Sequence, residues 1–328
     1  MKNYKVFIVI PTIRNLTFLE EWGDEFRNCS GLIVEDHPEK IVASPITFFK
    51  QVYHYTWADI HNDFGDNEWI FSRKNAGIRS YGFYKAYQLG ADVIITLDDD
   101  CFPTGKHFVN QHIDNLQFKA ATYWFSTYPD PRFIYTRGFP YRIRDQLQVM
   151  VSHGLWSGAL DLDGQTEAKL PRLLNEIPYR SIRQIIPQNY FFPMCSMNLA
   201  FRREAIPLMY FPLMGYDPAG KPWGYDRFDD IWAGLMVKKI CDHLGWAVVN
   251  GSPFVEHRKA SSISGNVAKE KPGLKVNEVF WQKVVAVKLT NSTSITALQE
   301  LIAKLDWPKG EYFRKLKLAY EIWISYFA

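Results

Sequence analysis

Apolar residues in this chain come in short runs that are rich in β-branched side chains. Residues 6–10 form a continuous apolar run closed by Pro11, and a similar run occupies residues 93–97. A shorter run lies at residues 32–34. Runs of this length and composition predict strands that are buried on both faces, as in the parallel sheets of α/β proteins.

Segments with helical features separate these strands. Asn15 is a candidate N-cap for a helix that follows the first strand, and Ser72 is a candidate N-cap for a helix running through Tyr87. Gly90 ends that second helix just before the strand at 93–97. The alternation of strand and helix predicts a doubly wound sheet whose ligand-binding edge lies at the carboxyl ends of the strands.

The pattern becomes less regular from about residue 118, where aromatic residues, prolines and arginines predict short strands and long loops. The regular elements expected after it are a strand at 197–201, a helix at 230–243, a strand at 246–249 and helices at 277–287 and 312–328. We therefore expect a catalytic α/β domain over residues 1–275. A helical C-terminal extension, residues 276–328, is expected to pack on it.

Composition narrows the class of protein. The chain has 47% hydrophobic and 22% charged residues and a formal net charge of +3, which fits a globular protein without the basic footprint of a nucleic-acid binder. Its four cysteines are widely spaced, and neither a signal peptide nor an apolar run of membrane length is evident. We expect a cytoplasmic protein that has no membrane span and binds a small anionic substrate, not a nucleic acid.

Candidate chemistry begins with three consecutive aspartates, Asp98, Asp99 and Asp100, directly after the strand at 93–97. Adjacent carboxylates repel one another, so a positive group is expected beside them. Mg²⁺ or Mn²⁺ prefers carboxylate oxygens together with substrate phosphates, and the strand end therefore predicts a metal and diphosphate site of the DxD type. A solvated turn is the alternative for the tripeptide taken alone.

Basic residues are expected on the same edge. Arg14, Arg73, Lys74 and Arg79 lie in predicted loops or helix starts and could neutralise a diphosphate, although each alone is more often a solvated surface charge. Asp36 follows the second strand, where an acidic residue can hydrogen-bond a base or ribose. A simple loop carboxylate is an equally good interpretation of Asp36.

Two further groups lie later in the chain. His257 follows a strand-like stretch and could complete a metal site begun by Asp100, although a lone histidine is more often a packed or surface residue. Asp229 and Asp230 lie at a helix start, where the helix dipole alone favours carboxylates. The same pair could also bind sugar hydroxyls or act as a base.

A segment dense in arginine and aromatic residues spans 137–145 and leads into residues 151–156. It fits either a basic solvated loop or a wall that faces a sugar ring, with Arg144 near the anomeric carbon.

The ordered series of motifs resembles the reversibly glycosylated polypeptides, a family that includes plant UDP-arabinopyranose mutases and is classed as glycosyltransferase family 75. The matching stretches are residues 9–16, 94–102, 137–156, 192–195, 197–201, 227–234, 240–245, and His257 with residues 259–261. Together they run from the first strand to about Trp281, which makes the series far more specific than a lone DxD motif.

The resemblance implies a GT-A-like nucleotide-sugar fold with a mixed, mainly parallel central sheet flanked by helices. It also implies a metal-dependent cytosolic mutase that interconverts pyranose and furanose forms of a UDP-sugar, most simply UDP-L-arabinose, without flavin. Reversible self-glycosylation falls on Arg144, the position that matches the family's arginine motif. A homo-oligomer is also expected.

The candidate roles follow from this combined interpretation. The catalytic residues are Arg144, Asp229 and Asp230, and the metal ligands are Asp98, Asp100 and His257. The nucleotide-sugar-binding residues are Pro11, Thr12, Arg14, Asp36, Lys74, Arg79, Asp98, Asp99 and Asn198. Guanidinium has a pKa above about 12, so Arg144 would need a neighbouring carboxylate, such as Asp229 or Asp230, to act as a nucleophile.

Some positions depart from the family. Ser196 stands where the family pattern has glycine, residues 158–188 match poorly, and residues 216–221 form a longer loop expected beside the site. The sugar therefore stays open. A glycosyltransferase acting on a separate acceptor, or a glycosylated non-catalytic partner of an active paralogue, are the alternatives to a mutase.

Overall fold

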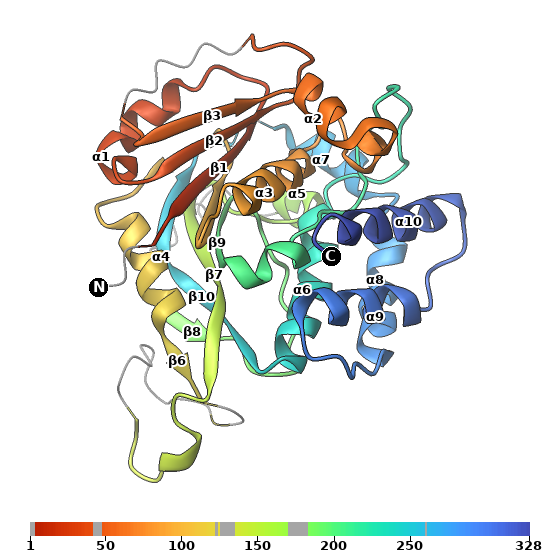
Figure 1. The fold of residues 1–328 in the computed structure, drawn as a ribbon. Coiled ribbons are helices and arrows are strands. Elements are labelled where there is room, and N and C mark those ends of the chain that lie inside the picture. The colour runs from red at the N-terminus through yellow and green to blue at the C-terminus, as the bar shows by residue number, and fades with distance from the viewer. Residues whose placement is uncertain (1–3, 42–47, 122–123, 125–134, 170–182, 260) are drawn as a thin grey trace.

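The computed structural model describes residues 4–41, 48–121, 124, 135–169, 183–259 and 261–328. One mixed sheet runs through it, with helices on both sides (Figure 1). Its main strands are β1 (Val6–Thr12), β2 (Ser30–Glu35), β3 (Gln51–Tyr55), β4 (Val93–Leu97), β5 (Cys101–Pro103), β7 (Leu147–Gly158), β9 (Asn198–Arg202) and β10 (Trp246–His257). Two short strands, β6 (Lys119–Ala120) and β8 (Arg183–Ile185), lie beside them.

The strands follow the order β3-β2-β1-β4-β9-β7-β10-β5. The pairs β3–β2, β2–β1, β1–β4 and β7–β10 are parallel, whereas β9 is antiparallel to both β4 and β7, and β5 is antiparallel to β10. The expected α/β class with a mixed, mainly parallel sheet is confirmed. Because β9 reverses the direction twice, β4, β7 and β10 all end at the same edge.

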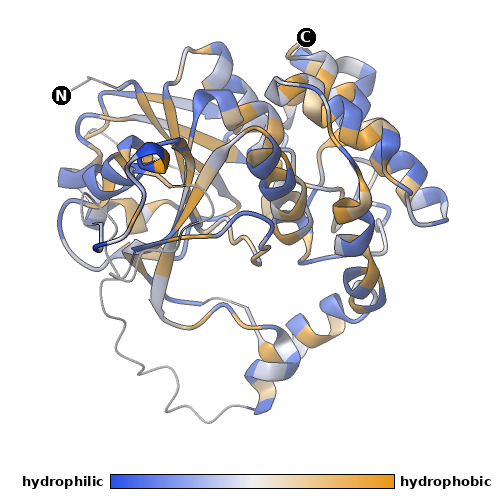
Figure 2. Ribbon diagram, turned by 90° about the horizontal axis from the view of Figure 1, so that it is seen from below, coloured by the Kyte–Doolittle hydropathy of each residue, from blue (hydrophilic) through white to orange (hydrophobic). Residues whose placement is uncertain are grey.

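The helices are α1 (Gly23–Phe26), α2 (Trp57–Phe64), α3 (Arg79–Gln88), α4 (Phe108–Gln117), α5 (Gly164–Lys169), α6 (Asp229–His243), α7 (Ile263–Glu270), α8 (Leu274–Ala286), α9 (Ser294–Lys304) and α10 (Glu311–Ser325). None within the described residues is both long and apolar enough to cross a bilayer. Figure 2 shows hydrophobic residues concentrated along the strands and on one side of several helices.

The apolar run of β1 is buried throughout because its side chains alternate between two cores. Phe7 and Val9 point into the core covered by α3, α6 and the C-terminal helices, while Ile8 and Ile10 point into the core covered by α1 and α4. The C-terminal helices share the first core: Trp323 of α10 is fully buried and its indole N–H donates to the Pro207 carbonyl at 2.8 Å.

Several expected elements differ at their ends. Ser72 does not cap a long helix; its hydroxyl accepts from the Met214 N–H, and α3 begins only at Arg79. Asn15 caps no helix either, since a short 3₁₀ helix, Thr17–Trp22, follows without a side-chain cap. The sequence pattern also missed the twelve-residue strand β7, whose Ser152, His153 and Gly154 interrupt the apolar run.

A polar network inside the sheet explains that interruption. His112 of α4 hydrogen-bonds Ser152 Oγ and Asn198 Oδ1, each at 2.9 Å, and His153 hydrogen-bonds Asn250 at 2.8 Å. Burial lowers the pKa of His112 to about 3 and that of His153 to about 4, so both rings are neutral at physiological pH. Buried polar groups that are all paired in this way fix one register of β7 against β9.

Gly154 gives a direct test of this packing. A Cβ at residue 154 would overlap the amide of Asn198, whose Nδ2 already donates to two backbone carbonyls, so Gly154→Ala should lower the free energy of unfolding by about 1–3 kcal/mol. Urea denaturation measures the change. Gly105→Ala is the matched control, because nothing lies within 4 Å of its added Cβ; equal effects of the two substitutions would contradict the packing.

Candidate functional site

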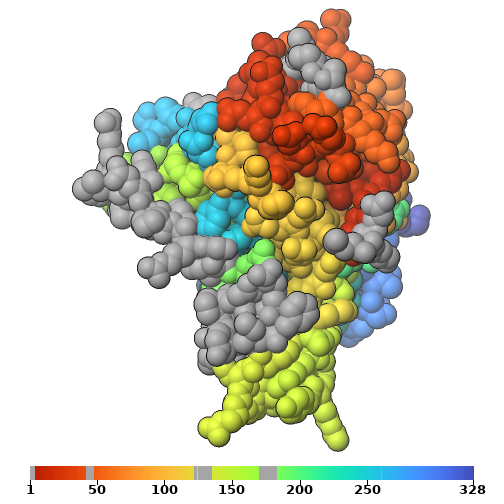
Figure 3. All heavy atoms as spheres, turned by 90° about the vertical axis from the view of Figure 1, so that its left-hand side faces the viewer, coloured from red at the N-terminus to blue at the C-terminus, as the bar shows by residue number. Residues whose placement is uncertain are grey.

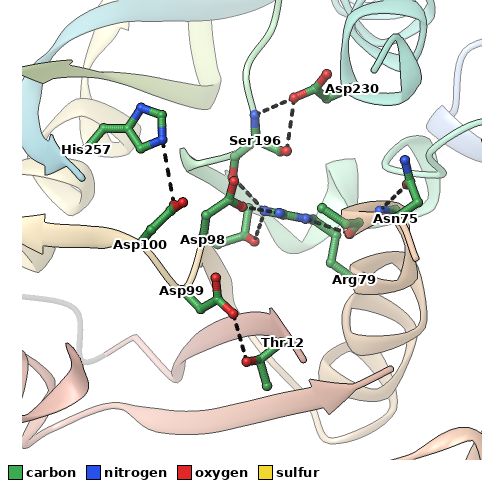
Figure 4. A network of polar contacts seen from close by, with 12 residues as sticks. Thr12, Asn75, Arg79, Asp98, Asp99, Asp100, Ser196, Asp230 and His257 are labelled. Carbon is green, nitrogen blue, oxygen red and sulfur yellow. Dashed lines mark hydrogen bonds and ion pairs between the residues drawn. The ribbon is translucent and has the colours of Figure 1, made fainter. Parts of the chain in front are cut away.

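The three aspartates at the end of β4 have three different partners (Figure 4). Asp98 is paired with the guanidinium of Arg79, and Asp99 accepts hydrogen bonds from the Thr12 hydroxyl at 2.9 Å and from Arg14. Asp100 faces His257, with 3.7 Å between Oδ1 and Nε2. Burial and the neighbouring carboxylates raise the pKa of Asp99 and Asp100.

Arg79 is a buried arginine that connects several parts of the site. The first residue of α3, it is fully buried and donates to Thr96 Oγ1 at 2.9 Å, to the Ser196 carbonyl at 2.8 Å and to Asp98. A buried arginine with every branch engaged joins α3, β4 and the segment before β9 into one unit. It can attract a diphosphate through its charge, but its donors are already used within the protein.

Arg14 and Asp100 have more freedom than Arg79 and Asp98. The Arg14 side chain is 46% exposed, and its Nη2 lies between Asp99 and Asp100, 3.8 Å from the Asp100 carboxylate. A metal or a phosphate entering here would meet a cation that can turn toward solvent and a carboxylate without a close partner.

The His257 ring has an orientation that suits a metal ligand. Its Nδ1 donates to the Ala159 carbonyl at 3.0 Å, which leaves Nε2 of the neutral ring with a lone pair that faces Asp100. The pair fits a divalent cation in the chemistry of its donors. Asp98 is drawn into the Arg79 ion pair, and the described residues contain no ready-made group of three such ligands; substrate oxygens would have to complete the shell.

Asp36 anchors a second polar group next to the first. Its two carboxylate oxygens accept from the Trp57 indole at 2.6 Å and from the Lys74 backbone N–H, while its own N–H donates to the Thr12 carbonyl. Trp57 is covered by the guanidinium of Arg73, 4.4 Å from the ring centroid. The expected loop at 216–221 does lie here: Tyr216 pairs with Arg73 through the backbone, and its ring lies under the Lys74 ammonium.

Two further acids of the site, Asp229 and Asp230, lie at the start of α6. Asp229 is buried, and burial together with Asp230 raises its pKa to about 8. Asp230 accepts from both the N–H and the hydroxyl of Ser196, at 2.9 and 3.0 Å, and burial and Asp161 raise its pKa to about 6. Ser196, the departure from the family's glycine, therefore supplies a hydroxyl that holds Asp230 in place.

Asp161 belongs to the same site and was missed by sequence reasoning. It follows β7, and its carboxyl group lies near the Cys195 thiol, Arg227, His257 and Asp98. The signal in the sequence was the same one that identified Asp98: an acidic residue just beyond a strand end. It was overlooked because β7 itself was not predicted and residues 158–188 matched the family poorly.

Arg144 is the expected site residue that the structure does not bring to the aspartates. It lies three residues before the start of β7, and β7 runs parallel to β4, so Arg144 is at the opposite edge of the sheet. The seven residues from Leu147 to His153 alone span about 20 Å at a strand's rise per residue. Figure 3 shows the segment that precedes β7 as a yellow-green projection at the lower end of the molecule. Of the two interpretations of this segment, the structure does not support a sugar-facing wall with Arg144 beside the aspartates. Trp156, near the carboxyl end of β7, does lie at their edge of the sheet.

Local contacts hold Arg144 at that edge. Its guanidinium lies 3.9 Å from the ring centroid of Tyr141 and 4.5 Å from that of Tyr135, and it donates to the Phe139 carbonyl. Neither Asp229 nor Asp230 can therefore activate it here.

Asn198 and Pro11 lie under the site and not in it. The Asn198 amide is fully buried and hydrogen-bonded to His112 and to the Leu155 and Pro253 carbonyls, so it supports the sheet beneath the aspartates. Pro11 is buried within β1 beside Val34.

Asp229 predicts a pH dependence of stability. Its pKa of about 8 means that the folded protein keeps a proton that the unfolded chain loses above pH ~4, so this group makes stability fall as pH rises toward 8. Asp229→Asn should raise the free energy of unfolding by on the order of 2 kcal/mol or more near pH 9 and by much less near pH 5. Urea midpoints at the two pH values measure it; the same change at both would contradict a buried, protonated Asp229.

Comparisons with known proteins bear on this site as a whole. The family model described as reversibly glycosylated polypeptide matches residues 1–327. UDP-arabinopyranose mutase 3 of Arabidopsis thaliana is 41% identical over 287 residues, covering 84% of this chain and 75% of the relative. UDP-arabinopyranose mutase 1 of the same plant is 38% identical over 339 residues, covering 97% and 90%.

Among solved structures, a mannosyltransferase from Pyrobaculum calidifontis in complex with GDP-Man and Mn²⁺ is similar at a TM-score of 0.40 and 10% identity, covering 98% of this chain and 70% of that one. UDP-arabinopyranose mutase 1 of Oryza sativa subsp. japonica is 36% identical over 343 residues, covering 97% and 89%. The relatives bear the names of isomerases, as expected for an enzyme of this class. The family model and these identities agree along nearly the whole sequence, and the chain belongs to the reversibly glycosylated polypeptide family.

Proposed function

We propose that this protein is a UDP-sugar mutase that interconverts pyranose and furanose forms of UDP-arabinose at the carboxyl edge of its sheet. One observation carries the proposal: Asp100 and His257 lie together with two arginines and two further aspartates at the end of β4. The relatives of the chain are named UDP-arabinopyranose mutases.

The nucleotide would lie over β1 and β2. Asp36 is held by Trp57 and Lys74, and each of its oxygens keeps a lone pair that can accept from the N–H of a uracil ring. Arg14 and Lys74 are exposed and flank the path from Asp36 to the aspartates, where a diphosphate would extend. Thr12 links the two ends of this path, since its carbonyl binds Asp36 and its hydroxyl binds Asp99.

Asp100 and His257 would hold a Mn²⁺ or Mg²⁺ ion together with diphosphate oxygens, and Asp98 would contribute only after loosening its pair with Arg79. Such an ion neutralises charge that builds up on the departing diphosphate. Arg14 adds a second positive charge on the open side, and fully buried Arg79 adds a fixed one from below. The chain thus stabilises the leaving UDP from two directions.

The sugar would lie beyond the diphosphate, toward α6. Asp230 is oriented by Ser196 and can bind sugar hydroxyls. The neighbouring Asp229, whose pKa is raised to about 8, would be present as a protonated acid. Ring conversion needs no separate acceptor, so the site has to keep the sugar close to the UDP until the bond re-forms.

Self-glycosylation on Arg144 remains part of the proposal through the family resemblance. Arg144 lies across the sheet from the aspartates, so its glycosylation would be a separate event, requiring either movement of the segment that carries it or a sugar from another molecule.

The mutase activity is tested by incubating the protein and Mn²⁺ with UDP-arabinopyranose and separating the products by chromatography. We expect UDP-arabinofuranose without any added acceptor, loss of activity with a chelator, and at least a 100-fold lower rate for Asp100→Asn, because a metal-binding carboxylate is removed. Lys106→Gln, in the loop after β5, is the control and should keep the wild-type rate. Sugar transfer only to an added acceptor would contradict the proposal.

The glycosylation site is tested by peptide mass spectrometry after incubation with UDP-arabinose. We expect one pentose on Arg144, and Arg144→Lys should abolish it. A pentose found on Arg137 or Arg142, two other arginines of the same segment, would overturn the assignment.

A further inference from the structure

Asp161 lies just beyond the end of β7, beside the candidate site. Gly158, the last residue of β7, pairs with His257 of β10. Asp161 is exposed, yet the surrounding protein desolvates its carboxyl group and raises its pKa. Four groups of the candidate site interact electrostatically with this carboxyl group: His257, Asp98, Arg227 and Asp230.

Asp98, Asp99 and one oxygen of Asp230 already have close partners. Asp98 is bound to Arg79, Asp99 to Thr12 and Arg14, and Oδ2 of Asp230 to both donors of Ser196. Asp161 instead lies near the thiol of Cys195, which is at most a weak donor. Its oxygens therefore keep most of their capacity to accept a hydrogen bond from a substrate hydroxyl.

The segment that carries Asp161 is fixed at both ends. On one side, Ala159 exchanges hydrogen bonds with His257, since its N–H donates to the His257 carbonyl at 3.1 Å and its carbonyl accepts from the His257 ring. On the other side, the Gly164 N–H donates to Glu270 of α7 at 2.7 Å. Asp161 is thus held at a set distance from the proposed metal ligand His257.

Glu270 extends this support to the wall of the site. Its second oxygen accepts from Arg227 at 2.8 Å, and Arg227 lies close enough to Asp161 to favour the charged carboxylate. Burial opposes that charge and raises the pKa of the carboxyl group.

We propose that Asp161 is a further catalytic residue of this site, the carboxylate that carries a proton between the two oxygens that close the alternative sugar rings. The inference rests on the mutase function proposed above. It gives Asp161 a role that neither the three aspartates after β4 nor the two acids of α6 fill.

The proton balance of the reaction defines that role. The bond between C1 and the β-phosphate oxygen breaks with its electron pair on the phosphate, the 4-hydroxyl oxygen bonds to C1, and its proton passes to Asp161. The bond between C1 and the old ring oxygen, O5, then breaks with its electron pair on O5, which takes the proton back from Asp161. The phosphate oxygen re-forms its bond to C1. One proton has moved from O4 to O5, and Asp161 ends as it began.

The test compares Asp161→Asn with wild-type protein in two assays. One measures conversion of UDP-arabinopyranose to UDP-arabinofuranose at saturating substrate. The other follows ¹⁸O exchange between bridging and non-bridging positions of the β-phosphate, which reports cleavage and return of the C1–O bond without any change of ring. We expect conversion to fall by about 100-fold or more, while exchange stays within a few fold, because only the proton transfer is removed.

Matched variants separate this role from a structural one. Asp163→Asn, two residues away, keeps an acceptor for the Thr166 N–H at the start of α5 and should leave both assays unchanged. Asp161→Glu keeps the carboxyl group and should restore part of the conversion. Unchanged conversion in Asp161→Asn, or parallel loss of conversion and exchange in both Asp161 variants, would overturn the inference. Wild-type protein without conversion would instead contradict the mutase function itself.

Discussion

Repulsion among carboxylates at one edge of the sheet is the constraint on which the rest of this site depends. Asp98, Asp99 and Asp100 leave β4 together, and Asp161 and Asp230 approach from β7 and α6. Within the described residues, Arg79, Arg14, Arg227 and His257 are the positive or ionisable groups that interact with them. Burial, and after it the neighbouring carboxylates, raise the pKa values of Asp99, Asp100 and Asp230. A cation arriving with a diphosphate would relieve the remaining repulsion, so electrostatics favours binding metal and substrate together.

Each of the three aspartates has a different partner, so the three carboxylates have different roles. Asp98 is locked to a buried arginine and ties α3 to β4, Asp99 links to the end of β1, and Asp100 alone is left facing a histidine. A motif of three identical residues therefore contains a structural anchor in Asp98, a link to β1 in Asp99, and in Asp100 the carboxylate that we propose as a metal ligand. Their sequence could not separate these roles, because each depends on a partner from a distant part of the chain.

The sequence predicted the strands that carry the site better than the segments that complete it. Buried parallel strands such as β1 and β4 have continuous apolar runs, so their ends, and the acids at those ends, could be read directly. β7 was missed because His153 and Ser152 are buried through paired hydrogen bonds, which no hydrophobic pattern records. Without β7, neither the place of Asp161 nor the distance of Arg144 from the aspartates could be deduced.

The central claim is that Asp100 and His257 hold a divalent cation at this edge, with the nucleotide extending toward Asp36. A crystal structure with UDP and Mn²⁺, with the metal located by its anomalous scattering, tests it most directly. The account predicts a peak within about 2.0–2.6 Å of Asp100 and His257 ligand atoms, with the uracil beside Asp36. A metal bound elsewhere, or UDP bound at the opposite edge near Arg144, would contradict it.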